Sequence, residues 1–139
     1  MGRLRPRSPY EKLGGYVHLP RLIDKARLHR EGLLDGYNYK TVGFDKHLLA
    51  FLKLDGDAFE EIANNLDSDA AILKWVQENG AGHSSEAIEL WNQAMICRHP
   101  DNPAKKARFL HFLKRAGGEG RKDIRTYFDL IELDEGRLK

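Results

Sequence analysis

The sequence predicts an all-α fold, a single compact domain of about seven short helices. Apolar residues recur three and four positions apart along most of the chain, which is the spacing of one helix face. Short turns rich in Gly, Pro, Asn and Asp separate these periodic stretches. No internal repeat or linker divides the 139 residues, a length typical of one domain. We therefore expect a basic N-terminal arm over residues 1–10 and one helical domain over residues 11–139.

The first predicted helix covers residues 19–31. Leu19, Leu22 and Ile23 share one of its faces. Gly32 follows where a left-handed C-cap is expected. The pattern indicates an amphipathic helix whose other faces carry many charged residues.

A loop is expected after this helix, because residues 32–43 contain three glycines. Alternating residue types at Tyr37–Val42 favour a short extended piece within the loop. The second helix should then cover residues 45–53.

Five more helices are expected along the rest of the chain, each introduced by a turn or by a capping residue. Asp57 with Glu60 three positions later is a capping pattern. Asp67 or Ser68, and Ser84 or Ser85, are further expected N-caps. The expected ranges are about 57–66, 68–79, 85–98, 104–116 and 124–133.

Composition argues against several classes of protein. The chain is 41% apolar and 32% charged, which is typical of a globular protein and not of a disordered one. No apolar run approaches the roughly 18 residues of a membrane span. The N-terminus does not resemble a signal peptide, and a lone cysteine, Cys97, cannot form an internal disulfide. We expect a soluble cytoplasmic protein.

Charge is segregated along the chain. Residues 1–54 carry 11 basic and 5 acidic side chains, residues 55–96 carry 1 and 9, and residues 97–139 carry 11 and 7. One interpretation is a basic surface for a polyanion. The other, which we favour, is that acidic and basic helices face each other within the fold or across a homodimer. A net charge of only +2 argues against a nucleic-acid binder.

Several ordered runs indicate a family. They are Pro6-Arg7-Ser8-Pro9 followed by Leu13 to Arg27, then Asp45-Lys46 with Phe51-Leu52, and finally Tyr127 to Ile131 with Asp134 to Arg137. Through these runs the chain resembles the bacterial DUF5069 family, small helical proteins with no assigned activity. The resemblance implies a one-domain helical fold and no particular chemistry.

A polar cluster around the first helix start is the main candidate for binding. Backbone amides at a helix start attract anions, and an arginine one turn later adds a bidentate donor. We expect a site for an anionic small molecule or a peptide there. The alternative is a structural cluster, in which Asp24 pairs with Arg21 or Arg27 and the tyrosines cover the core. The candidate ligand-binding residues are Tyr16, His18, Arg21, Asp24, Lys25, Tyr39 and Asp45.

Two other functions remain open beside a non-catalytic binding module. One is an enzyme that uses the same polar cluster. The other is a co-chaperone, because His99-Pro100-Asp101 resembles the signature loop of J-domains. A helix-ending proline followed by a capping aspartate explains the same three residues without a partner.

We expect no cofactor, no metal site and no catalytic residue. No two histidines lie three or four positions apart, and no CxxC or HExxH pattern occurs. The expected partner is an unknown small molecule or protein, with neither nucleic acid nor membrane. The basic arm, with Arg3, Arg5 and Arg7, should track phosphate, fray at the terminus, or dock on the acidic residues Asp129, Glu132, Asp134 and Glu135.

Overall fold

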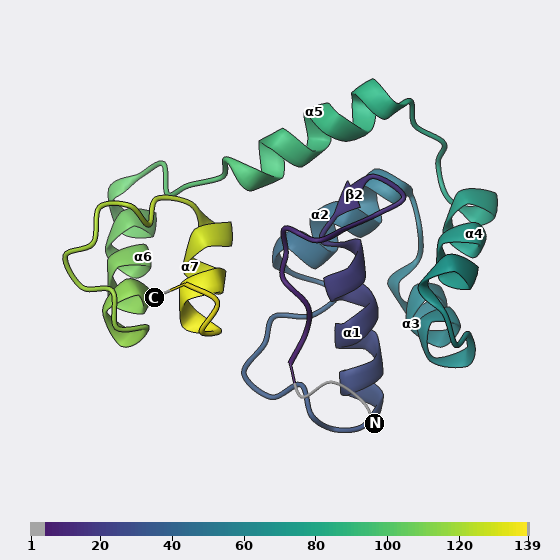
Figure 1. The fold of residues 1–139 in the computed structure, drawn as a ribbon, viewed down its shortest axis with the longest axis horizontal. Helices are drawn as coiled ribbons and strands as arrows, with labels where there is room; N and C mark the ends of the chain where they lie inside the picture. The colour runs from purple at the N-terminus through teal and green to yellow at the C-terminus, as the bar shows by residue number, and fades with distance from the viewer. Residues whose placement is uncertain (1–4, 139) are drawn as a thin grey trace. The chain divides into compact units, whose positions relative to one another are not determined.

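A computed structural model describes residues 5–138, so Arg3 of the predicted arm lies outside the described residues. Helices dominate, with one small sheet, which confirms the predicted mostly α-helical fold (Figure 1). The elements are β1 (Lys12–Leu13), β2 (Tyr16–Val17), α1 (Leu19–Arg30), α2 (Gly43–Leu52), α3 (Gly56–Asn65), α4 (Asp69–Asn79), α5 (Ser85–Ile96), α6 (Pro103–Arg115) and α7 (Tyr127–Asp134).

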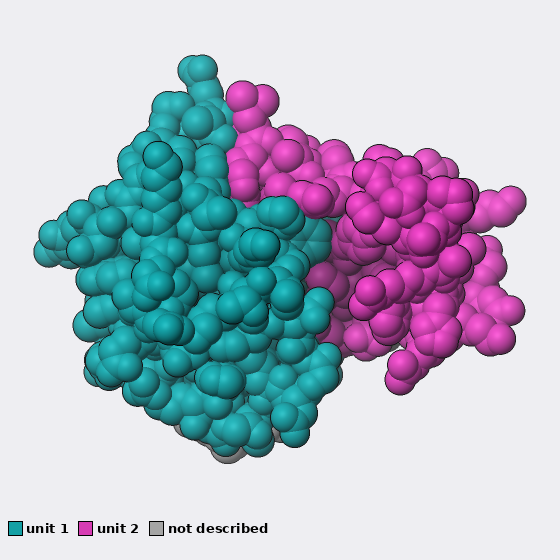
Figure 2. Space-filling model, turned by 180° about the vertical axis from the view of Figure 1, so that it is seen from behind, with its two compact units in different colours: residues 1–89 teal, residues 90–139 magenta. Residues whose placement is uncertain are grey.

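The chain divides into two compact units, residues 1–89 and residues 90–139 (Figure 2). We call them unit 1 and unit 2. The boundary falls within α5, between Glu89 and Leu90. The arm at residues 1–10 and the single domain at residues 11–139 stay predictions.

A two-residue hairpin leads into α1. Its strands are antiparallel, with Lys12 opposite Val17 and Leu13 opposite Tyr16. Among the described residues these are the only strands, so the extended piece predicted at residues 37–42 is not part of a sheet. The reason is that backbone groups of that segment bind side chains of α1 and α2 instead.

The core of unit 1 is built around α1, which packs against α3 (Figure 1). Leu19, Leu22, Ile23 and Ala26 are fully buried, which confirms the predicted apolar face. The burial extends to other faces of the helix, however, because nine of its 12 residues are buried. Charged residues of α1 therefore lie inside the protein.

Helix starts in unit 1 follow the expected capping chemistry, with one shift. Ser68 accepts a hydrogen bond at the start of α4, and Ser84 does so at the start of α5. Asp55 caps α3, whereas the prediction named Asp57. The prediction was wrong because α3 begins earlier than expected, which leaves Asp57 in its first turn to pair with Lys40.

Unit 2 contains the helix pair α6 and α7. A small apolar core, formed by Phe109, Leu113, Ile124 and Leu133, joins them. Most of the remaining α6 surface is exposed. Within residues 5–138, no helix has the length and apolar character needed to cross a membrane.

We predict that Gly80→Ala destabilises the protein by about 1–3 kcal/mol. A Cβ atom at Gly80 would lie 2.8 Å from the backbone oxygen of Leu52 and 2.9 Å from that of Val76, so the ends of α2 and α4 would have to separate. Urea denaturation followed by circular dichroism measures the loss. Gly82→Ala is the matched control, because a Cβ atom there meets nothing within 4 Å. Equal stability of the two variants would contradict the prediction.

Candidate functional site

His18 joins the hairpin to α1 in an unusual backbone conformation. It is the N-cap residue, with φ 72° and ψ −17° in the left-handed region, and its side chain does not cap the helix. Its Nε2 atom lies 2.6 Å from Oδ1 of Asp45 in α2, and both side chains are buried. A non-glycine residue in this region costs about 1 kcal/mol or more, so the surrounding structure must hold it there.

The Asp45 carboxylate gathers donors from three parts of unit 1. Besides His18, the Lys25 ammonium donates to its two oxygens at 3.2 and 3.4 Å, and the backbone N–H of Lys40 donates at 2.9 Å. Lys25 also donates to the backbone oxygen of Asn38 at 2.8 Å. We call these five residues the Asp45 cluster. It binds the segment before α2 to α1.

The charges within the cluster follow from its surroundings. Burial alone would raise the pKa of Asp45, but the hydrogen bond from His18, the positive charge of Lys25 and the Lys40 N–H outweigh it and lower that pKa. Burial lowers the pKa of His18, and the charges of Lys25 and Arg21 act in the same direction against the opposing effect of Asp45. At neutral pH, Asp45 is therefore ionised, and a neutral His18 donates its Nε2–H to it.

A second ionic group ties the N-terminal segment to α1. Arg7 Nε lies 2.9 Å from Asp24, and its Nη1 lies 2.6 Å from Asp69 at the start of α4. Its backbone N–H also donates to Asp24. Asp24 thus pairs with Arg7, a partner that the sequence analysis did not name. The Arg7 side chain binds Asp24 and Asp69 of unit 1, which are not the four acidic residues near the C-terminus that were expected to receive the arm.

Arg21 is buried beside this second group. Its Nη1 donates to the backbone oxygen of Arg7 at 3.1 Å, and its guanidinium lies 5.9 Å from the ring centre of Tyr37. Arg21 and Lys25 are four residues apart on α1 and so lie on one face. Each of these two cations donates to a neutral backbone carbonyl.

Tyr39 points to a different partner. Its hydroxyl donates to Glu60 of α3 at 2.6 Å, and Lys40 Nζ lies 2.6 Å from Asp57 and 3.5 Å from Glu60. Burial, followed by the adjacent Glu60, raises the pKa of Tyr39. Tyr39 therefore joins the segment before α2 to α3, outside the Asp45 cluster.

Tyr16 contacts another part of unit 1. Its hydroxyl lies 3.1 Å from Nδ1 of His83, and its ring meets the Phe51 ring edge-on. His83 itself stacks on Phe51 with ring centres 3.8 Å apart. Burial raises the pKa of Tyr16. This aromatic group packs the hairpin against the end of α2.

The structure thus divides the seven predicted site residues. His18, Lys25 and Asp45 meet directly, while Arg21 and Asp24 meet through Arg7. Every predicted site residue except Tyr39 is buried. The cations Arg7, Arg21 and Lys25 match the carboxylates Asp24, Asp45 and Asp69 in number, which makes a charge-balanced group.

Sequence reasoning missed four contributors: Arg7, Asn38, Lys40 and His83. Asn38 and Lys40 act through backbone atoms, which no residue-type pattern reveals. Arg7 reaches Asp24 across 17 positions and Asp69 across 62, so no local spacing reports either pair. Across residues 5–138, no group of three or more His, Cys, Asp and Glu side chains is arranged to hold a metal ion.

The chain was compared with protein families and with curated proteins. A family model described as Domain of unknown function (DUF5069) matches residues 3–137, almost the whole chain. No curated protein matches it.

We predict that Asp45→Asn lowers the free energy of unfolding by about 3–5 kcal/mol, because the buried Lys25 loses its carboxylate partner. Urea denaturation measures the change. Asp35→Asn, at an exposed position of the segment before α2, should alter stability by less than about 0.5 kcal/mol. Equal effects of the two substitutions would show that Asp45 has no special structural role.

We also predict that stability falls as the pH drops below about 6.5, the ordinary pKa of histidine. The unfolded chain takes up a proton there, whereas buried His18 has a lowered pKa and stays neutral in the folded state. The stabilisation that comes from the neutral, buried His18 is complete above that pH and declines as the pH falls below it. His18→Gln should flatten the decline in urea denaturation between about pH 7 and 5, and the exposed His99→Gln should leave it unchanged. An equally steep decline of stability with falling pH in both variants would contradict the assignment of this pH dependence to His18.

Proposed function

The chain belongs to the DUF5069 family, which has no assigned function, and from the geometry of unit 1 we propose that it is a non-catalytic binding module for an anionic group. The proposed site lies on the face of α1 that carries Arg21 and Lys25. Its ligand is a small molecule or a peptide with a carboxylate or phosphate group.

One observation carries the proposal. Arg21 donates to the backbone oxygen of Arg7, and Lys25 donates to the backbone oxygen of Asn38 in addition to the Asp45 carboxylate. An anionic oxygen attracts a cation through a full negative charge, whereas a neutral carbonyl attracts it only through its dipole. A ligand oxyanion that replaces the two carbonyls would therefore gain energy from both cations.

Backbone strain at the adjacent Asp45 cluster supports the same location. Among the described residues, three non-glycine residues have positive φ: His18, Lys40 and Lys53. Two of them donate to Asp45. Strained conformations gather where a structure must present groups in a fixed geometry.

Access to the site requires movement of residues 31–42. Asn38 and Tyr37 of this segment contact the two cations. The segment has no helix or strand, and Leu33 and Val42 expose large apolar side chains. In the proposed binding step the segment opens, the anion binds Arg21 and Lys25, and His18 remains bound to Asp45.

The other two functions gain no support. A J-domain presents a basic face on the helix before its signature loop, whereas α5, which precedes His99-Pro100-Asp101, contains no Lys or Arg. Nothing observed in unit 1 indicates a reaction for an enzyme. We keep a cytoplasmic location as part of the proposal, because the free thiol of Cys97 is exposed and suits a reducing compartment. The proposed partners include neither nucleic acid nor membrane.

We predict that inorganic phosphate binds the intact chain and shifts the amide NMR signals of residues 18–25 and 37–45. Phosphate titration at constant ionic strength gives the dissociation constant. Arg21→Lys and Lys25→Met should each weaken binding at least tenfold, because each alters one of the two proposed donors. Lys46→Met removes an exposed charge from α2 and is the matched control.

Circular dichroism should first show that each variant is folded. Equal phosphate affinity in the parent protein and both site variants would refute the proposed site. The absence of saturable binding at millimolar phosphate would refute it as well.

A further inference from the structure

Helix α6 has one narrow buried face and a broad exposed surface. Phe109 and Leu113, four residues apart, pack with Ile124 and Leu133 in the core of unit 2. The helix has 13 residues, and the eleven others are all exposed. The helix and the core beneath it both belong to unit 2.

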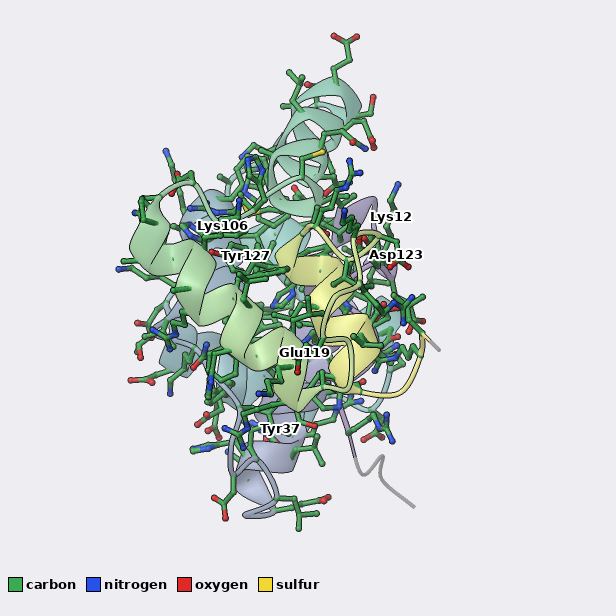
Figure 3. All side chains as sticks on the ribbon, turned by 90° about the vertical axis from the view of Figure 1, so that its left-hand side faces the viewer. Lys12, Tyr37, Lys106, Glu119, Asp123 and Tyr127 are labelled. Atoms are coloured by element: carbon green, nitrogen blue, oxygen red, sulfur yellow. The ribbon has the colours of Figure 1, made fainter. Side chains whose placement is uncertain are left out.

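One side of this exposed surface is basic with an aromatic centre. Lys105, Arg108, Phe112 and Arg115 are three, four and three positions apart, so they share one side of the helix. Phe112 is 39% exposed, and the Arg108 guanidinium lies 5.6 Å from the centre of its ring. We call these four residues the basic face. Figure 3 shows α6 along its length, with Lys106 labelled on it.

The cations of the basic face are poorly matched by carboxylates. The helix contains five Lys and Arg residues and no Asp or Glu. Lys105 pairs with Asp101 at 3.2 Å, but both side chains are more than half exposed, so the pair contributes little. Among residues 5–138, no carboxylate forms an ion pair with Arg108 or Arg115. These two arginines can therefore bind an acidic partner without first breaking an ion pair within residues 5–138.

The spacing of the basic face fits an acidic helix. A helix rises about 1.5 Å per residue, so Arg108 lies about 6 Å from Phe112 along the axis, and Arg115 lies about 4.5 Å from Phe112 on the other side. A partner helix with an apolar residue between two carboxylates, four and three positions away, has the same separations. Each arginine can then bind a carboxylate through two parallel N–H groups, while the apolar residue packs against the Phe112 ring.

We propose that the basic face of α6 is a docking site for an acidic helical segment of another protein. The charges of Arg108 and Arg115 select acidic side chains, and the exposed Phe112 selects an apolar side chain between them. Arginine and aromatic residues are enriched in protein interfaces and among the residues that contribute most to binding. This site lies in unit 2 and is independent of the anion site proposed on α1 in unit 1.

Two other anionic partners fit this face less well. A single-stranded nucleic acid stacks its bases on exposed aromatic rings, whereas the guanidinium of Arg108 lies over the ring of Phe112. A helix at a membrane surface inserts its apolar face among the lipids, whereas the apolar face of α6 is buried in the core of unit 2. An acidic helix needs only the charges and the part of the ring that are exposed.

Fluorescence anisotropy with labelled peptides tests the docking site. The matched peptide is an alanine-rich helix in which one face carries a leucine, with one glutamate four positions before it and another three positions after it. The shuffled peptide has the same composition, with its glutamates on different faces. At about 0.15 M salt, where exposed charges more than about 8 Å apart are screened, we expect saturable binding of the matched peptide to the intact chain. The shuffled peptide should bind at least tenfold more weakly.

Substitutions on α6 test the charges and the ring separately. Arg108→Glu with Arg115→Glu should weaken binding of the matched peptide at least tenfold, and a peptide with lysines in place of the glutamates should bind this variant more tightly than it binds the parent protein. Phe112→Ala should remove the preference for leucine over serine at the centre of the peptide. Lys106→Glu with Lys114→Glu is the matched control, because it changes the net charge equally on other sides of the helix. It should alter the affinity by less than about threefold.

Circular dichroism should first show that each variant is folded. Equal affinity for the matched and shuffled peptides would overturn the proposal, as would an equal loss of affinity in the two double variants. The absence of saturable binding at hundreds of micromolar peptide would also overturn it. If an RNA oligonucleotide or phosphatidylglycerol vesicles bound more tightly than the matched peptide, and reversal of Arg108 and Arg115 abolished that binding, the face would belong to that partner and the proposal would be wrong.

Discussion

The buried carboxylate of Asp45 is the constraint on which unit 1 depends. A charge removed from water costs several kcal/mol unless the protein replaces its hydration with hydrogen bonds and an opposite charge. His18, Lys25 and the Lys40 backbone provide that replacement, and they come from the helix start, the helix body and the segment before α2. Forming this cluster therefore fixes how α1, α2 and residues 31–42 pack, and it explains why His18 and Lys40 adopt left-handed conformations.

The acidic and basic segments that are separate along the sequence are brought into contact within unit 1. The basic segment of residues 1–54 and the acidic segment of residues 55–96 form ion pairs with each other, such as Arg7 with Asp69 and Arg30 with Glu61. The acidic helices thus neutralise the basic ones inside the unit, as the favoured interpretation expected. Unit 2 contains 11 Lys and Arg against 7 Asp and Glu, and five of these basic residues lie on α6.

Local patterns predict the helices and the apolar face of α1, because apolar spacing and capping residues act within a few positions of the chain. They also identify the polar region that becomes the Asp45 cluster. They do not predict its partners, since Lys40 contributes a backbone amide and Arg7 arrives from a distant segment. Local patterns do not reveal burial either. Helix α1 has the sequence pattern of an amphipathic helix, and its charged residues become buried only when the other elements of unit 1 cover them. Helix α7 begins at Tyr127, three residues later than expected, since Ile124 joins the core of unit 2 from outside the helix.

The most direct test of the central claim is the protonation state of His18, read from the ¹⁵N chemical shifts of its imidazole ring at neutral pH. We expect a neutral ring with the proton on Nε2, because that nitrogen faces the ionised carboxylate of Asp45. The signal should persist as the pH falls through 6.5, the ordinary histidine pKa. A doubly protonated ring, or a proton on Nδ1 alone, would contradict this arrangement of the cluster.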